Sequence, residues 1–212
     1  LYEDMERKLP RDAVIASSTS GLLISELQAG RFGPERYIVG HPFNPPHIVP
    51  LVEVVGGRET DPSIVDWAIA FYNAHGKRAI RIRKEVLGHL ANRLQVALFR
   101  EAVHAVDTGI ATVEDVDAAI SFGPGLRLAL MGPIMINHLA GGEGGMKHML
   151  DHLGPAIEKW WSDLGTPRLS KEIGRKLCQG LEHEVAGRPV AELAKERDSL
   201  LVALLEILKQ KP

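Results

Sequence analysis

The sequence predicts an α/β unit followed by an all-α unit, and three observations carry this prediction. Short apolar runs alternate with helix signals over residues 1–84, a rhythm typical of βαβ units and a mostly parallel sheet. After about residue 85 the strand signals stop, and apolar residues recur at helical spacing. The length of 212 residues accommodates both units. We therefore expect an α/β domain over 1–84 and a helical domain over 85–212.

The first unit opens within a helix and then contains four expected strands. Residues 13–16 are apolar without polar alternation, the pattern of a strand buried on both faces. Further strands are expected at 37–39, 51–55 and 78–82, and helices at 22–29 and 62–75. Asp61 as N-cap and Pro62 at the first helical position mark the start of the second helix.

The second unit begins with a long helix that ends near Gly109. Its apolar face is formed by Leu87, Leu90, Leu94, Ala97, Leu98, Ala102 and Ala105. Thr112 followed by Asp115 indicates a capped start for the next helix. Two stretches rich in Gly, at 122–133 (also rich in Pro) and 141–145, follow, and residues 190–209 form an expected terminal helix.

Composition excludes several classes of protein. The 25 Lys+Arg are matched by 27 Asp+Glu, which argues against a nucleic-acid partner. No apolar run reaches the ~18 residues of a membrane span, so no membrane partner is expected. The single cysteine, Cys178, allows no internal disulfide, which fits a reducing compartment, and we expect a cytoplasmic protein.

Two polar clusters follow expected strands, where ligands bind in open α/β sheets. One is the Ser-Ser-Thr-Ser of 17–20, and the other is the His-Pro-Phe-Asn-Pro-Pro of 41–46. Glu53 lies among apolar strand residues, so it needs a partner or a route to solvent. His41 is the nearest partner in sequence, and such a pair could act as a general base and acid. The alternatives are that Glu53 faces solvent from an edge strand and that the serines only cap a helix.

The sequence contains an ordered set of motifs, which are residues 18–20, 41–45, 51–54 and 88–94, followed by Gly132-Pro133. In these motifs the sequence resembles the 3-hydroxyacyl-CoA dehydrogenase family. The resemblance implies the C-terminal part of a Rossmann-type doubly wound sheet, followed by a helical domain like that of 6-phosphogluconate dehydrogenase. It also implies NAD as the cofactor, oxidation of a 3-hydroxy group on a small-molecule substrate, and a homodimer formed through the helical domain.

The resemblance also implies a role for each matching residue. His41 would take the proton of the substrate's 3-hydroxyl, and Glu53 would be its pairing carboxylate. Ser20 and Asn44 would hydrogen-bond the substrate oxygen or the cofactor. Asn92 would help to place the substrate against His41.

The nucleotide-binding part departs from the family pattern. Ser18 would lie near the nicotinamide, but no Gly-x-Gly-x-x-Gly turn occurs before residue 85. By the resemblance, we expect the first, nucleotide-binding half of the Rossmann domain to lie outside this chain.

The segment 122–133 is longer than in typical acyl-CoA enzymes of the family and carries Arg127. It is more similar to the branch that oxidises small free acids, the L-carnitine and L-gulonate dehydrogenases. Arg127 could clamp a substrate carboxylate with two hydrogen bonds, or it could be a surface or interface arginine.

Two rival functions stay open at this point. One is the oxidation of CoA thioesters, which lack the free carboxylate, and the other is a non-catalytic, dimerising protein that keeps the fold. His148 and His152 have the i, i+4 spacing of metal ligands, but no third ligand completes a set, so we expect no metal.

Overall fold

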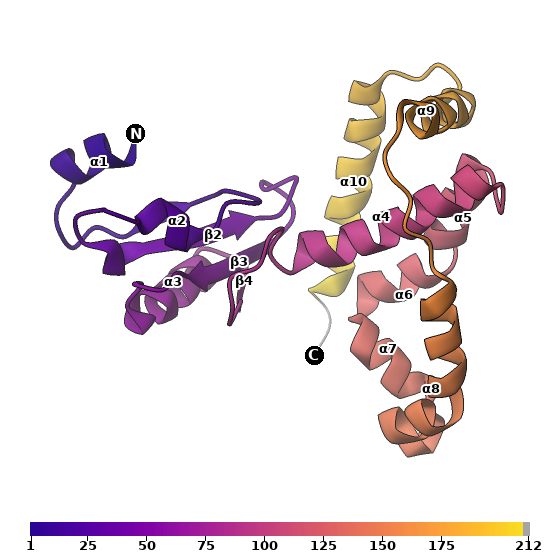
Figure 1. The fold of residues 1–212 in the computed structure, drawn as a ribbon, viewed down its shortest axis with the longest axis horizontal. Coiled ribbons are helices and arrows are strands. Elements are labelled where there is room, and N and C mark those ends of the chain that lie inside the picture. Colours follow the sequence, from indigo (N-terminus) through magenta and orange to yellow (C-terminus); the bar gives the residue numbers. More distant parts are fainter. Residues whose placement is uncertain (210–212) are drawn as a thin grey trace. The chain divides into compact units, whose positions relative to one another are not determined.

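A computed structural model of the protein describes residues 1–209 and contains two compact units, residues 1–96 and residues 97 onward (Figure 1). The first unit holds a four-stranded sheet with helices, and the second is helical. The predicted order of an α/β unit followed by an all-α unit is confirmed. The division between the units falls within helix α4 (Ala91–Thr108).

The sheet is mixed, with strand order β1-β2-β3-β4. Its strands are β1 (Ile15–Ser17), β2 (Tyr37–Pro42), β3 (Leu51–Gly56) and β4 (Arg78–Arg81). The β1–β2 and β3–β4 pairs are parallel, but β2 and β3 are antiparallel. The expectation of a mostly parallel sheet missed this reversal, which arises because the connection 43–50 contains no crossover helix.

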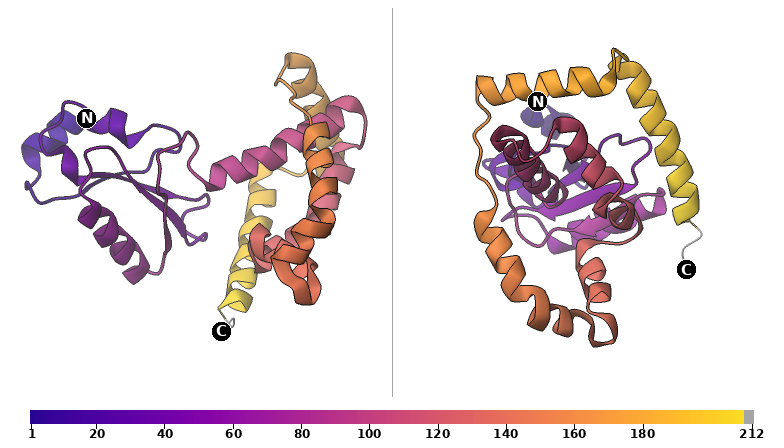
Figure 2. Two further views of the ribbon diagram at one scale, coloured as in Figure 1. Left: turned by 60° about the horizontal axis from the view of Figure 1, so that its bottom comes forward. Right: turned by 90° about the vertical axis from the view of Figure 1, so that its right-hand side faces the viewer.

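Alternating residues of the central strands fill two apolar layers. Tyr37, Val39 and Val55 pack on one face, together with Ile24 of helix α2 (Ile24–Gln28) and residues of helix α1 (Tyr2–Lys8). Ile38, Val52 and Val54 pack on the other face against helix α3 (Pro62–Ala74). Figures 1 and 2 show α2 and α3 on opposite faces of the sheet. Side chains two residues apart along a strand therefore share a face.

The predicted start of α3 is confirmed in detail. The Asp61 carboxylate accepts the Ser63 N–H, and this hydrogen bond lowers the pKa of Asp61. Two other expectations were less accurate. Ala16 in β1 is exposed, so that strand is not buried on both faces, and α2 is shorter than the expected helix over 22–29.

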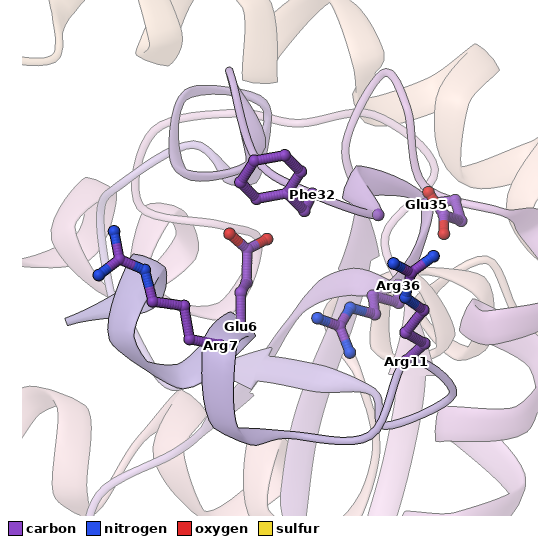
Figure 3. Close-up of a pocket in the computed structure, with 7 residues that line it drawn as sticks. Glu6, Arg7, Arg11, Phe32, Glu35 and Arg36 are labelled. Atoms are coloured by element: carbon purple, nitrogen blue, oxygen red, sulfur yellow. The ribbon is translucent and has the colours of Figure 1, made fainter.

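A hollow of about 530 Å³ lies beside α1 in the first unit (Figure 3). Arg36, at the end of the short 3-10 helix η1 (Pro34–Arg36), is buried there and donates hydrogen bonds to the carbonyls of Pro10 and Ala13. Arg36 thereby fixes the loop between α1 and β1. The hollow is lined by Phe32, Gly33 and charged residues of both signs, namely Glu6, Arg7, Arg11, Glu35 and Arg36.

The second unit continues α4 with six further α-helices and one 3-10 turn among the described residues. These are α5 (Val113–Ser121), α6 (Pro124–Leu130), α7 (Pro133–Ala140), η2 (Gly142–Gly144), α8 (Gly145–Asp163), α9 (Lys171–Val185) and α10 (Val190–Leu208). The predicted cap is confirmed, since Thr112 Oγ1 accepts the Asp115 N–H. The stretch 122–133, for which no element was predicted, contains α6 and the start of α7, and each begins with a proline at its first position.

The helical unit buries few apolar side chains. Within its described part, the buried apolar side chains are those of Val103, Met149 and Ile173. No single described helix is long and apolar enough to cross a membrane; residues 113–130 and α7 meet the length and composition criteria only as a pair bent by 97°. No group of three or more His, Cys, Asp or Glu side chains in residues 1–209 is arranged to hold a metal ion.

Candidate active site

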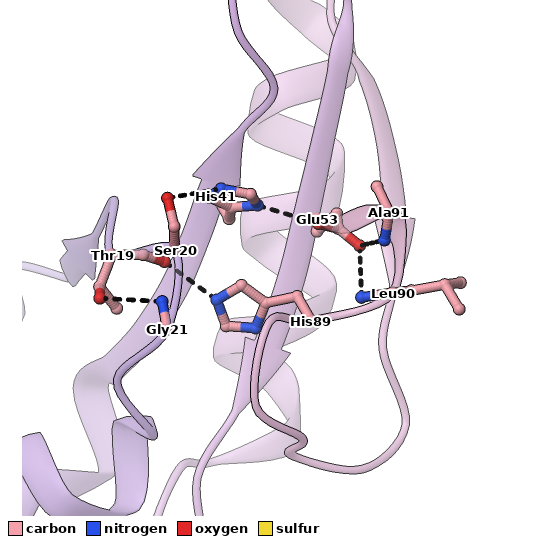
Figure 4. Close-up of polar contacts among 8 residues, drawn as sticks. All are labelled: Thr19, Ser20, Gly21, His41, Glu53, His89, Leu90 and Ala91. Carbon is pink, nitrogen blue, oxygen red and sulfur yellow. Dashed lines mark hydrogen bonds and ion pairs between the residues drawn. The ribbon is translucent and has the colours of Figure 1, made fainter. Parts of the chain in front are cut away.

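The register of β2 and β3 places His41 directly opposite Glu53. Opposed residues on antiparallel strands point to the same face of the sheet, and here the His41 Nδ1 atom lies 2.9 Å from Glu53 Oε2 (Figure 4). Both side chains are buried. The predicted pairing is therefore present, and Glu53 does not face solvent from an edge strand, because β3 lies between β2 and β4.

The Glu53 carboxylate is satisfied by three N–H donors although it is completely buried. Its Oε2 atom accepts from His41, and its Oε1 atom accepts the backbone N–H groups of Leu90 and Ala91, each at 2.9 Å. Ala91 is the first residue of α4, and the N-terminus of a helix favours a negative charge. These contacts compensate for the desolvation of the ionised carboxylate.

The hydrogen bonds fix the tautomer of neutral His41. An ionised carboxylate only accepts hydrogen bonds, so His41 Nδ1 carries the proton and donates it to Glu53. His41 Nε2 then presents a lone pair, which faces the Ser20 hydroxyl at 3.0 Å. Ser20 itself is exposed and lies in the loop after β1. The arrangement is a buried carboxylate, an oriented imidazole and a hydroxyl at the surface, which is suited to proton transfer.

A second histidine, His89, lies beside the pair. Its ring centroid is 5.0 Å from that of His41, and its Nε2 atom is 2.9 Å from the carbonyl oxygen of Thr19. His89 is buried and has a positive φ of 49°. It directly precedes the two backbone N–H groups that bind Glu53.

The other predicted site residues lie on several different elements of the fold. Ser18 and Asn44 are exposed and follow β1 and β2, whose parallel pairing brings their carboxyl ends to one edge of the sheet. Asn92 is half-buried in the first turn of α4. Arg127 is exposed on α6 and belongs to the helical unit. His41 itself lies inside β2, not in the loop where the sequence placed it.

Sequence reasoning missed the donors that hold Glu53. The helix expected from Leu87 begins only at Ala91, because Gly88 and His89 both adopt left-handed backbone conformations. A glycine just before a helical pattern was the available signal, since glycine readily adopts positive φ. The turn places Leu90 and Ala91 N–H groups where the carboxylate of a distant strand can accept them.

Comparison with known families matches most of the described chain to one family. Residues 1–86 match the NAD binding domain of 3-hydroxyacyl-CoA dehydrogenase, and residues 88–181 match its C-terminal domain.

The most similar curated proteins include L-carnitine dehydrogenases. The protein from Nocardiopsis dassonvillei is 49% identical over 99% of this chain and 64% of its own length. The protein from Bacillus cereus is 46% identical over 94% of this chain and 61% of its own length. The chain thus spans a little under two thirds of these relatives.

Among solved structures, a 5-formyl-3-hydroxy-2-methylpyridine 4-carboxylic acid 5-dehydrogenase, described as an NAD⁺-dependent dismutase, superposes with a TM-score of 0.84. It is 28% identical, and the match covers 100% of this chain and 69% of that structure.

Proposed function

Because the chain belongs to the 3-hydroxyacyl-CoA dehydrogenase family, we propose that it carries the acid–base machinery of an NAD-dependent dehydrogenase. In this proposal the enzyme oxidises the 3-hydroxyl of a small free acid to a ketone. His41 is the catalytic base and Glu53 its pairing carboxylate.

The observation that carries this proposal is the tautomer of His41. Its Nδ1 proton is committed to a buried carboxylate, so Nε2 is the atom that accepts a proton. The Ser20 hydroxyl at 3.0 Å marks where a second hydroxyl can approach Nε2. The Ser20 hydroxyl would turn from Nε2 to donate to the substrate oxygen, and the substrate's 3-hydroxyl would give its proton to the Nε2 lone pair that Ser20 has left. The resulting imidazolium would be stabilised by Glu53.

The residues at this edge of the sheet also suit the nicotinamide end of NAD. Exposed hydroxyls of Ser18 and Ser20 and the amide of Asn44 gather at the carboxyl ends of β1 and β2, where ligands of such sheets bind. When bound, NAD would accept the hydride that leaves the carbon bearing the hydroxyl. His41 would hold the proton, which balances the oxidation. No Gly-x-Gly-x-x-Gly turn occurs in this sequence, and the contacts proposed here are to the nicotinamide end of NAD.

For the substrate we propose a carnitine-like hydroxy acid. The identity of 44–49% to proteins named L-carnitine dehydrogenase supports this class. Arg127 is exposed and forms no ion pair within residues 1–209, so its guanidinium is free to bind a carboxylate. Asn92 would help to place the substrate against His41.

The test is NADH formation by the full-length protein with L-carnitine, L-gulonate, 3-hydroxybutyrate and 3-hydroxybutyryl-CoA. We expect turnover of a free acid, carnitine above the others. Arg127→Met should raise KM for the free acid at least tenfold, while Arg175→Met, at another exposed arginine, should not. Turnover of the thioester alone would refute the free-acid assignment, and no turnover of any hydroxy compound would refute the dehydrogenase itself.

We further propose that the helical unit associates with a second copy of the chain. The small number of buried apolar side chains supports this, because the unit exposes many large ones, among them Phe99, Leu126, Met135, Leu139 and Trp160. Light scattering should give the mass of a dimer, and a monomer at micromolar concentration would contradict it.

We also propose a cytoplasmic location, which the single free cysteine, Cys178, supports.

A further inference from the structure

Two features of His89, in the α/β unit, are energetically unfavourable. Its φ of 49° is a left-handed conformation that is unfavourable for a residue with a side chain. Its Nδ1 atom is buried and has no hydrogen-bond partner within the described residues, and an orphaned buried polar atom is also unfavourable. Such costs persist only where surrounding contacts impose them, and they concentrate at functional sites.

The ring of His89 is tied to the loop that carries Ser20. A carbonyl oxygen can only accept a hydrogen bond, so His89 Nε2 carries the proton and donates it to Thr19, at 2.9 Å. Thr19 directly precedes Ser20, whose hydroxyl is otherwise exposed to solvent. The hydrogen bond therefore fixes the backbone one residue away from the group that faces His41 Nε2.

The backbone of His89 is tied to the other side of the pair. Its left-handed turn leads directly into Leu90 and Ala91, whose N–H groups converge on Glu53 Oε1. His89 is thus connected to both hydrogen bonds of His41: its ring holds the Thr19 carbonyl next to Ser20, and its turn leads into the two N–H groups that bind Glu53 (Figure 4).

We propose that His89 is the positioning residue of this catalytic pair. It does not itself accept the substrate proton, because its Nε2 proton is committed to Thr19 and its Nδ1 atom is buried. Its function is to keep the Ser20 oxygen close to His41 Nε2, so that the substrate oxygen meets both groups in one geometry. This inference rests on the proposed function of His41 as the base.

The experiment compares two amides at position 89 in the full-length protein. The amide nitrogen of Gln stands where imidazole Nε2 stands, whereas that of Asn stands where Nδ1 stands. His89→Gln therefore keeps a donor for the Thr19 carbonyl, and His89→Asn loses it. Asn tolerates the left-handed backbone better than most residues, so this variant should remain folded. His89→Phe is a third variant, which keeps the ring volume without any donor.

We expect His89→Asn and His89→Phe to lower kcat about tenfold, the factor that corresponds to one ordinary hydrogen bond. KM should change less than twofold, and His89→Gln should restore kcat to within threefold of the wild type. A wild-type kcat in His89→Asn, or equal losses in the Asn and Gln variants, would overturn the proposal.

Crystal structures of the same variants separate this inference from the proposed function. The distance from Ser20 Oγ to His41 Nε2 should exceed hydrogen-bond range in His89→Asn and stay close to 3.0 Å in His89→Gln. An unchanged distance in His89→Asn would refute the positioning role whatever the protein oxidises. Absence of activity in the wild type, with the distances as expected, would refute only the assignment of the reaction.

Discussion

Replacing Glu53 by Gln tests the electrostatic core of the site with almost no change of shape. The amide oxygen can keep the two backbone N–H groups of Leu90 and Ala91, which now bind Oε1. The amide NH₂ then faces His41 Nδ1, where the carboxylate stood. Two donors cannot share that contact, so His41 must change tautomer and place its proton on Nε2. The lone pair that faces Ser20 is lost, and with it the base.

The expected decrease in kcat follows from this change of tautomer. General acid–base catalysis contributes about 10²–10⁴-fold, which corresponds to ~3–5 kcal/mol of transition-state free energy. We expect kcat of Glu53→Gln to fall by this factor. The free energy of unfolding should change by only ~1 kcal/mol, because the two backbone hydrogen bonds persist and the amide NH₂ donates to His41 Nδ1 in place of the third.

The assay is steady-state NADH formation by the full-length protein at saturating substrate, with thermal unfolding measured in parallel. Glu59→Gln is the matched control, since Glu59 is an exposed carboxylate in the same unit. A Glu53→Gln enzyme that keeps more than a third of the wild-type kcat would refute the assigned tautomer. An equal loss in the control would show that the effect is not local.

Three further substitutions test one other residue of the site and two residues outside it. Ser20→Ala removes the hydroxyl that faces His41 Nε2 and should lower kcat about tenfold with unchanged thermal stability; a normal kcat would exclude its role in holding the substrate oxygen. Gly40→Ala places a methyl group about 2.2 Å from the Tyr72 hydroxyl and should cost roughly 1–3 kcal/mol in urea unfolding; an unchanged midpoint would mean that Tyr72 moves freely. The pKa of Glu184 is raised by burial and by two carboxylates of α5, so its contribution to stability is present at acid pH and is lost as the pH rises through its folded-state pKa. Glu184→Gln should therefore raise the unfolding temperature at pH ~7, with the gain fading below the ordinary glutamate pKa of ~4.3; a gain independent of pH would contradict this.

Local patterns predicted those parts of the fold that local physics determines. The apolar run at Tyr37 identified β2, and Thr112 and Asp61 identified two helix starts. The antiparallel turn between β2 and β3 was missed, because strand direction depends on how the segments pair and not on their composition. Helices α6 and α7 were missed because Gly and Pro usually interrupt helices, although Pro fits the first helical turn.

The sequence predicted one part of the candidate site, the pairing of two side chains, but not the long-range contacts around it. A carboxylate within an apolar strand requires a partner or a route to solvent, which made His41 a candidate partner, and the family resemblance implied the pairing of Glu53 with His41 that the structure contains. The contacts of His89 could not be predicted, because they join residues 70 positions apart and depend on a left-handed turn. Substitutions can test the roles that stay predictions: catalysis by His41, Glu53, Ser20, Asn44 and Asn92, the cofactor contact of Ser18, and the substrate contact of Arg127.

Two of the three donors that hold Glu53 belong to the main chain, and this makes the site unusually insensitive to mutation at those positions. Every residue except proline brings the same N–H group to position 90 or 91, so the contacts survive almost any codon change. An alanine scan would record Leu90 as dispensable, and Ala91 would escape it altogether. Only a proline scan would reveal both positions, and natural variants there should be tolerated as long as proline is avoided.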